Sequence, residues 1–248
     1  MDGVLYINEQ PITSAIEFIN RIKEDRNVLL LTNNSRSTRS QYREKLASMG
    51  LAVREDQIMT SSLATAGYLD ENHDTRNATA FALGGVGLCE ELEGIGMRLV
   101  KDDAARRAEF VVVGWDTELT YEKLKIACLA LRAGAFFIAT NSDATYPSTD
   151  GVWPGAGAIL AAVETSASRS ALVIGKPHII MMQTALAAIG SNADCTLMIG
   201  DRLDTDILGG WRAGMDTCLV LTGISKREDV EEFEPRPDLI VNNLMELL

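Results

Sequence analysis

Residues 196–206, Thr-Leu-Met-Ile-Gly-Asp-Arg-Leu-Asp-Thr-Asp, join a short apolar run to three carboxylates. The run predicts a buried β-strand, and the pattern over 204–213 predicts a helix. In a parallel α/β sheet, ligands bind at the carboxyl ends of the strands. Three carboxylates at such an end repel one another unless a cation is bound, and hard oxygen ligands select Mg²⁺ or Ca²⁺. The alternative is a first helical turn rich in aspartate, which suits the helix dipole.

Apolar strand-like runs alternate with helix-like patterns along the rest of the chain. Further strands are predicted over Val28–Leu31, Thr79–Leu83, Phe110–Val113, Phe136–Ala139, Leu172–Ile174, Cys218–Leu221 and Leu239–Val241. Helices are predicted over residues 37–49, 119–133 and 178–189, and a loop rich in glycine and proline over Gly151–Gly157. This alternation is typical of an α/β fold with a mainly parallel sheet.

Composition excludes several classes of protein. The 248 residues carry a net charge of −12 and contain no block of lysine or arginine, which argues against a nucleic-acid partner. No apolar run approaches the ~20 residues of a membrane helix, and the N-terminus does not resemble a secretory signal, so we expect a cytoplasmic protein with no membrane partner. The four cysteines are far apart in the sequence. Two of them, Cys195 and Cys218, lie in apolar runs and are expected to be buried.

Three other segments place polar residues where a strand ends or a turn begins. Asp2 precedes a glycine, and this pair alone would usually be a turn. Thr32 and Asn33 follow a strand and precede a helix, so their hydroxyl and N–H groups could cradle a phosphate or could simply cap the helix. Lys176 lies between a strand and a proline, where it could neutralise a phosphate or could be an ordinary surface lysine.

The order of these four segments resembles the haloacid dehalogenase (HAD) superfamily of phosphatases. Asp-Gly-Val-Leu, Thr-Asn-Asn after a strand, Gly-Lys-Pro and Gly-Asp-x-x-x-x-Asp occur in that order over essentially the whole chain. The resemblance implies a Rossmann-like parallel-sheet core with an inserted α/β cap domain. It also implies Mg²⁺-dependent hydrolysis of small phosphorylated metabolites through an aspartyl-phosphate.

The resemblance assigns a role to each matching residue. Asp2 would be the general acid and base, and its carbonyl would bind Mg²⁺. Thr32 would bind the transferring phosphoryl group with the help of the Asn33 N–H, and Lys176 would neutralise it. Asp201 would be the carboxylate ligand of Mg²⁺. Asp206 would be a supporting ligand or the partner of Lys176, and Asp204 could be an outer member of the site.

The long interval between Thr32 and Lys176 is similar to the cap of the NagD-like, p-nitrophenylphosphatase type (subfamily IIA). This implies a core of residues 1–67 and 171–248 and a cap of residues 68–170. Substrate selectivity is expected near four cap residues: Trp115, Asp116, Asn141 and Asp143. For Trp115, packing in the cap core is an equal alternative. Caps of this type could pair through their sheets, so a homo-oligomer is possible.

One position of the family pattern falls outside the sequence. The first motif is Asp-x-Asp-Gly, and here Met1 is x, so the nucleophilic aspartate and its apolar strand should immediately precede Met1. We therefore expect little or no turnover from residues 1–248 alone. Two other functions stay open: a non-catalytic module that binds a phosphorylated ligand, and phosphoryl transfer to a sugar on the same scaffold.

Overall fold

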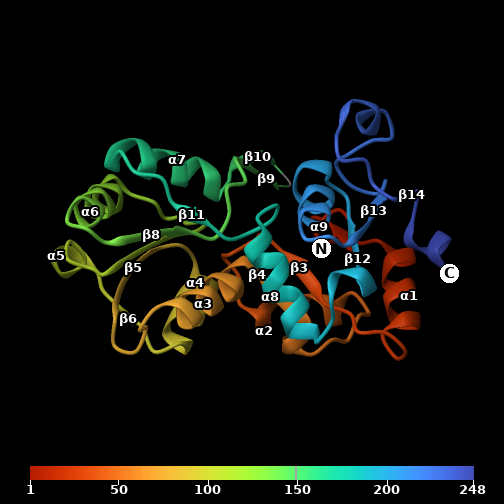
Figure 1. Cartoon of the computed structure of the whole chain (residues 1–248), viewed down its shortest axis with the longest axis horizontal. Helices are drawn as coiled ribbons and strands as arrows, with labels where there is room; N and C mark the ends of the chain where they lie inside the picture. Colours follow the sequence, from red (N-terminus) through yellow and green to blue (C-terminus); the bar gives the residue numbers. More distant parts are fainter. Residues whose placement is uncertain (149) are drawn as a thin grey trace. The chain divides into compact units, whose positions relative to one another are not determined.

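The structure is a computed structural model that describes residues 1–148 and 150–248 (Figure 1). Contacts divide the chain into two compact units. Unit 1 comprises Met1–Thr32, Ser40–Met59 and Lys176–Leu248, and unit 2 comprises Asn33–Arg39 and Thr60–Gly175. Among the described residues, no helix combines the length and the apolar character needed to cross a membrane.

The described part of unit 1 contains three short sheets and the helices that pack on them. Its strands are β1 (Tyr6–Ile7), β2 (Gln10–Pro11), β3 (Leu30–Thr32), β4 (Ile58–Thr60), β12 (Leu197–Gly200), β13 (Asp216–Val220) and β14 (Leu239–Val241). Its helices are α1 (Thr13–Ile22), α2 (Arg39–Ser48), α8 (Ile179–Ile189) and α9 (Leu208–Arg212), with a π-helical turn at Leu203–Ile207 and 3-10 turns at Glu55–Gln57, Ala193–Cys195, Glu228–Glu232 and Leu244–Leu247. Strands β12, β13 and β14 are parallel neighbours, β3 pairs with β4, and β1 and β2 form a small antiparallel hairpin.

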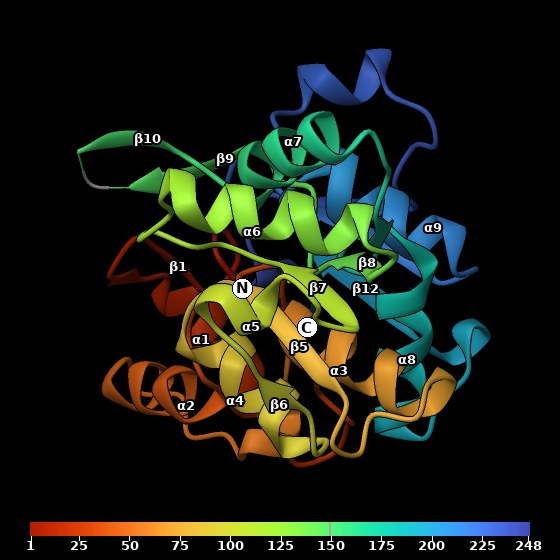
Figure 2. The ribbon, with the colours of Figure 1, turned by 90° about the vertical axis from the view of Figure 1, so that its left-hand side faces the viewer.

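Unit 2 is built on one five-stranded parallel sheet. Its strand order is β11 (Leu172–Val173), β8 (Phe136–Ala139), β7 (Phe110–Val113), β5 (Thr79–Leu83) and β6 (Arg98–Leu99). The other elements are α3 (Ser61–Asn72), α4 (Val86–Gly94), α5 (Asp102–Ala105), α6 (Tyr121–Arg132), α7 (Ala156–Ala167) and the hairpin of β9 (Thr145–Ser148) and β10 (Gly151–Pro154). Figure 2 shows α6 and α7 on one face of the sheet and α3 and α4 on the other.

The sheet of unit 2 is buried on both faces, which explains its sequence. Parallel strands covered on both sides need continuous apolar runs rather than alternating ones. Strand β7 is Phe-Val-Val-Val, and all four residues are buried. The main core of unit 2 forms where this strand and its neighbours meet the apolar faces of α6 and α7.

The predicted fold class is confirmed: the chain is an α/β protein with parallel-sheet cores. Two local predictions are wrong. Residues Gly151–Pro154 form β10 rather than a loop, because they pair with β9 in an isolated hairpin where proline is tolerated. Cys195 is exposed, because it lies in the 3-10 turn that precedes β12 and not in the strand; Cys218 is buried in β13 as predicted.

Candidate functional site

Asp201 directly follows β12 and is enclosed by backbone. Its Oδ2 accepts a hydrogen bond from the Ile224 N–H at 3.0 Å. A Cβ atom added to Gly3 would lie 2.1 Å from this Oδ2, and one added to Gly223 would lie 2.0 Å from it. A side chain at either position would displace the Asp201 carboxylate from the place that it occupies, and Gly3 also has a positive φ of 73°, which favours glycine.

Lys176 and Asp206 form a buried ion pair in unit 1. The Lys176 Nζ lies 2.6 Å from the Asp206 Oδ1, and the two side chains are 9% and 5% exposed. The second oxygen of Asp206 accepts the backbone N–H groups of Asp201 and Arg202, each at 3.2 Å. Burial alone would raise the pKa of Asp206, but the Lys176 ammonium and the backbone donors outweigh it and hold this pKa below its ordinary value.

The charge balance around Asp201 is different. Burial raises the pKa of the Asp201 carboxyl, the charge of Asp206 adds to the rise, and the Ile224 N–H opposes it. Asp201 is thus a buried carboxylate whose ionised form is disfavoured by its surroundings. A bound cation would reverse this preference, because opposite charge favours the ionised form.

Asp2 and Thr32 lie in unit 1 with these residues. The Asp2 Oδ2 accepts a hydrogen bond from the Tyr6 hydroxyl at 3.4 Å, and the carbonyl of the next residue, Gly3, accepts one from the Thr222 hydroxyl at 2.7 Å. Thr32 is the last residue of β3 and is buried. Asp204, in contrast, is exposed and pairs with Arg202 at 2.6 Å, so its carboxylate is already engaged at the surface.

The arrangement fits Mg²⁺ better than a metal with an all-protein ligand set. No group of three or more His, Cys, Asp and Glu residues is placed to hold a metal in the part of the chain that the structure describes. Mg²⁺ commonly binds through only one or two carboxylates and completes its shell with water and substrate phosphate. Asp201 could supply such a carboxylate, whereas both oxygens of Asp206 already accept hydrogen bonds.

Asn33 belongs to unit 2, where it meets two of the residues expected in the cap. Its side-chain amide donates to both oxygens of Asp143, at 3.0 and 3.2 Å. The Asn141 side-chain amide donates to the Asn33 backbone carbonyl at 2.7 Å, and the Asn141 Oδ1 accepts a hydrogen bond from the Asp143 backbone N–H at 3.1 Å. The Ser61 hydroxyl also donates to the Asn33 carbonyl, at 2.6 Å. Asn33, Asn141 and Asp143 therefore form one polar network.

Trp115 and Asp116 follow β7 and have structural contacts in unit 2. Trp115 lies in the main core, stacks on Tyr146 with ring centroids 4.2 Å apart, and donates its indole N–H to the Pro154 carbonyl at 3.0 Å. Asp116 is buried and pairs with Lys123 at 2.7 Å. These contacts fix both side chains in place. That Trp115 and Asp116 contact a substrate stays a prediction.

The sequence did not point to three residues that contact Asp201, Gly3 or Asp2 from other segments of the chain. Gly223 and Thr222 come after β13, and Tyr6 is in β1. The available signal was a Thr-Gly pair directly after an apolar run, at the carboxyl end of a strand. That pair resembles Thr32-Asn33, which also follows an apolar run and carries no charge.

Comparisons with known proteins identify the family. The profile of haloacid dehalogenase-like hydrolases matches residues 1–98, and a HAD-hydrolase-like profile matches residues 173–247. The 5′-nucleotidase YutF of Bacillus subtilis is 38% identical over 99% of this chain and 94% of its own length. The acid sugar phosphatase of Staphylococcus epidermidis is 40% identical over 96% of this chain and 90% of its own.

A solved structure agrees with these relatives. NagD from E. coli superposes with a TM-score of 0.91 at 30% identity, over 99% of this chain and 95% of that one. The similarity covers nearly the whole chain and therefore both units. The chain therefore belongs to the haloacid dehalogenase superfamily of phosphatases, in its NagD-like branch.

Proposed function

We propose that this protein hydrolyses small phosphate monoesters with Mg²⁺, and that the attacking group is an aspartate that immediately precedes Met1. The proposal depends most on one observation, the buried Lys176–Asp206 pair beside the enclosed carboxylate of Asp201. A buried Lys176–Asp206 ion pair beside Asp201, whose pKa is raised, is costly for a structural core and useful for binding a dianion and a cation.

Each residue has a role in the proposed site. Thr32 binds the phosphoryl group with the N–H of Asn33, and Lys176 neutralises its oxygens. Asp206 keeps Lys176 in position through the 2.6 Å contact. Asp201 and the backbone carbonyl of Asp2 would hold Mg²⁺. When bound, Mg²⁺ offsets the negative charge that collects on the phosphoryl oxygens.

The proposed reaction has two displacements at phosphorus. In the first, a carboxylate oxygen of the upstream aspartate bonds to phosphorus, the ester P–O bond breaks, and Asp2 gives its proton to the leaving oxygen. In the second, Asp2 takes a proton from water, and the water oxygen bonds to phosphorus. The acyl phosphate bond then breaks, which releases inorganic phosphate and restores the aspartate.

The substrates we propose are small and soluble. The relatives are named as a 5′-nucleotidase and an acid sugar phosphatase, so sugar phosphates and nucleoside monophosphates are the first candidates. We assign unit 1 as the catalytic core and unit 2 as the cap domain. Trp115, Asp116, Asn141 and Asp143 are the residues of unit 2 where we place selectivity.

The test compares two chains on a panel of phosphate monoesters. One chain is residues 1–248, and the other is extended upstream by an apolar strand that ends in aspartate before Met1. We expect Mg²⁺-dependent phosphate release, abolished by EDTA, from the extended chain only. Replacing the added aspartate by asparagine is the matched control and should remove turnover.

Two results would contradict the proposal. One is hydrolysis by residues 1–248 with the phosphoryl group recovered on Asp2. The other is activity that does not depend on Mg²⁺. Tight binding of inorganic phosphate without turnover by the extended chain would instead favour a non-catalytic binding module, and a phosphosugar product in place of free phosphate would favour a transferase.

A further inference from the structure

Segment 222–225 of unit 1 follows the carboxyl end of β13 and makes hydrogen bonds to two other segments of the proposed site. At its first residue, the Thr222 hydroxyl donates to the carbonyl of Gly3, the neighbour of Asp2, at 2.7 Å. Its last two residues make three hydrogen bonds to residues 201–203. One four-residue stretch is therefore bonded to both parts of the chain that supply the proposed ligands of Mg²⁺.

The hydrogen bond from Thr222 restrains the backbone that carries the Asp2 carbonyl. Gly3 has a φ of 73°, and its N–H donates to the Tyr6 carbonyl at 2.8 Å. The peptide bond between Asp2 and Gly3 is planar, so the direction of the Gly3 N–H also sets the direction of the Asp2 carbonyl. With its N–H bonded on one side and its carbonyl on the other, Gly3 has little freedom in either backbone dihedral. Thr222 thus holds the Asp2 carbonyl in place through Gly3.

The other end of the segment holds both the side chain and the backbone of Asp201. The Ile224 N–H donates to the Asp201 Oδ2, and the Ser225 N–H donates to the Asp201 backbone carbonyl, each at 3.0 Å. The Ser225 hydroxyl also accepts the Leu203 N–H at 3.1 Å, so Ser225 is bonded to the chain on both sides of Arg202. A rotation of the carboxylate or a shift of its backbone would break at least one of these bonds.

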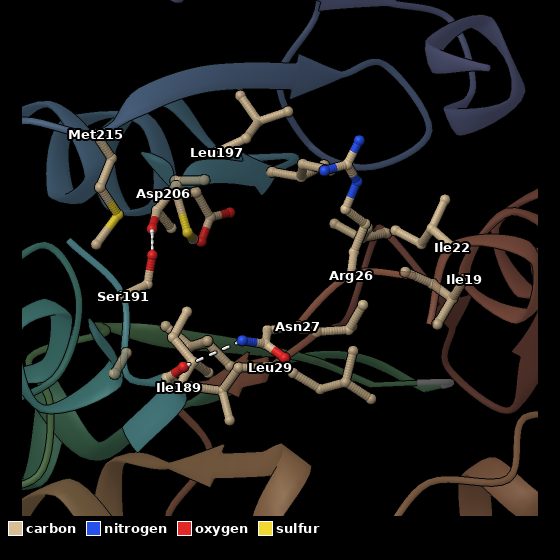
Figure 3. Close-up of a pocket in the computed structure, with 18 of the residues that line it drawn as sticks. Ile19, Ile22, Arg26, Asn27, Leu29, Ile189, Ser191, Leu197, Asp206 and Met215 are labelled. Atoms are coloured by element: carbon tan, nitrogen blue, oxygen red, sulfur yellow. Dashed lines mark hydrogen bonds between the residues drawn. The ribbon is translucent and has the colours of Figure 1, made fainter. Parts of the chain in front are cut away.

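Segment 222–225 is separate from the pocket of unit 1. This pocket has a volume of about 840 Å³, and it is lined by Asp206 together with apolar side chains such as Ile19 and Met215 (Figure 3). Among the described residues that line it, none belongs to segment 222–225, and neither Gly3 nor Asp201 is one of them. A substitution in the segment would therefore act on the proposed ligands and not on the volume of the pocket.

The relative position of two ligands matters more for Mg²⁺ than for Ca²⁺. Mg²⁺ requires a nearly ideal octahedral shell with oxygens at about 2.0–2.1 Å, whereas Ca²⁺ accepts irregular shells with oxygens at about 2.3–2.6 Å. A carboxylate and a carbonyl from two distant segments can fit Mg²⁺ only if something fixes one relative to the other. In unit 1, segment 222–225 is bonded to both.

We propose that segment 222–225 is a clamp that sets the position of the Asp201 carboxylate relative to the Asp2 carbonyl, and that Thr222 and Ser225 are positioning residues for Mg²⁺. The inference rests on the proposed function, because that proposal supplies the two ligands. Loosening the clamp at either end weakens the binding of Mg²⁺ more than the binding of Ca²⁺.

The experiment measures the binding of Mg²⁺ and of Ca²⁺ to residues 1–248 by isothermal titration calorimetry at constant ionic strength. In Thr222→Val, a methyl group of nearly the same size replaces the hydroxyl, so the Gly3 carbonyl loses its donor. We expect the Kd for Mg²⁺ to rise about tenfold and the Kd for Ca²⁺ to rise less than about threefold. Thr222→Ser keeps the hydroxyl and should keep most of the affinity for Mg²⁺.

Two controls separate a positioning role from general damage to the fold. Thr217→Val also removes a hydroxyl from the region of β13, one that donates to the Asp238 carboxylate at 2.7 Å near the amino end of the strand. It should lower the stability in urea and leave both dissociation constants unchanged. Asp201→Asn removes the proposed carboxylate ligand, so its titration gives the non-specific binding of divalent cations to a chain with a net charge of −12.

Ser225→Ala tests the other end of the clamp independently. It removes the acceptor of the Leu203 N–H and leaves Thr222 intact, and it should also raise the Kd for Mg²⁺ more than the Kd for Ca²⁺. If Thr222→Val does not fold, Ser225→Ala decides the outcome.

The outcomes separate this inference from the proposed function. A larger loss for Mg²⁺ than for Ca²⁺ in the variants of Thr222 and Ser225, with no change in Thr217→Val, supports the clamp. Unchanged affinities, an equal loss for the two ions, or the same loss in Thr217→Val overturns the clamp and leaves the proposed Mg²⁺ site standing. Wild-type binding no stronger than that of Asp201→Asn contradicts the proposed Mg²⁺ site and the clamp together.

Discussion

Lys176 and Asp206 form the buried pair on which the site of unit 1 depends. Replacing Lys176 by methionine leaves the Asp206 carboxylate buried without its main partner. Breaking such a pair from one side costs about 3–5 kcal/mol, and we expect a loss of this size in the free energy of unfolding measured with urea at pH 7. The exposed Arg21–Glu17 pair, whose atoms are also 2.6 Å apart, is the control; Arg21→Met should cost about 0.5 kcal/mol or less.

The sign of the pH dependence follows from the lowered pKa of Asp206. A carboxyl whose pKa is lower in the folded state stabilises the fold above its unfolded pKa, and this contribution disappears as the pH falls through the folded value. The difference between the wild type and Lys176→Met should therefore be full above pH ~5 and shrink below pH ~4. A difference that stays constant down to pH 3 would show that the loss comes from packing and not from charge.

One exposed and one buried cysteine should differ in their reactivity toward iodoacetamide. Burial raises the pKa of Cys218 to about 11, and its side chain lies in the core of unit 1. Cys195 is exposed in a turn. In the folded protein at pH 8, iodoacetamide should therefore modify Cys195 and spare Cys218, as seen in peptide mass spectra. Both should react in urea, and modification of Cys218 without denaturant would contradict its burial.

Single residues show clearly what the sequence could and could not predict. The position of Asp201 at the end of a buried strand could be predicted because an apolar run leads directly into it, whereas its role in a site stays a prediction. The contact of Asn33 with Asp143 could not be predicted, because a hydrogen bond between residues 110 positions apart leaves no local pattern. Cys195 was wrongly predicted to be buried, because an apolar run in the sequence does not show at which residue the strand begins.

At the scale of elements, the start of α4 is fixed by close contact with the segment Asn33–Arg39. The Gly87 N–H donates to the Arg36 carbonyl at 2.8 Å, and a Cβ atom on Gly87 would lie 2.2 Å from the Ser37 carbonyl oxygen. Gly87→Ala should therefore move this segment and destabilise the protein by about 1–3 kcal/mol in thermal or urea unfolding.

Gly94, at the end of the same helix, is the matched control. A Cβ atom there would meet nothing within 4 Å, so Gly94→Ala should be neutral or slightly stabilising, by up to about 1 kcal/mol. Equal effects of the two substitutions would mean that helix propensity, and not the contact with Ser37, determines the result.

The elements that were predicted best are those whose environment is uniform. Strands β5, β7, β8 and β14 have the predicted bounds, because buried parallel strands need unbroken apolar runs. The region 204–213 was predicted as one helix, yet it begins as a π-helical turn in which Asp206 reaches back to Asp201. Strand β10 depends on pairing with β9, and pairing in an isolated hairpin is a property of two segments together.

For the whole molecule, the net charge of −12 is the dominant electrostatic feature. Like charges on one chain repel each other more in the folded state, and salt screens them over a Debye length of about 8 Å at 0.15 M. The midpoint of thermal unfolding should therefore rise by a few degrees between about 0.01 M and 0.15 M NaCl and then level off. Sucrose at the same osmolality is the non-ionic control. A midpoint of thermal unfolding that falls with added salt would contradict the expectation.

The order of the two units along the chain could be predicted only in outline. A long interval between Thr32 and Lys176 indicated an insertion, but the return of Asn33–Arg39 to unit 2 had no signal in the sequence. The backbone changes unit four times, after residues 32, 39, 59 and 175. Contacts among segments this far apart arise from tertiary packing, which neither periodicity nor turn chemistry encodes.

These four changes of unit limit which segments could be exchanged with a related protein to make a chimaera. Unit 2 is not one contiguous cassette, because the short stretch Asn33–Arg39 belongs to it and is enclosed in sequence by two stretches of unit 1. A chimaera that exchanged only Thr60–Gly175 with a relative would keep the host's Arg36 and Ser37 against a foreign α4, where the clearance at Gly87 leaves no room for mismatch. Productive grafts should carry both pieces together, because the seven-residue stretch Asn33–Arg39 packs against the start of α4.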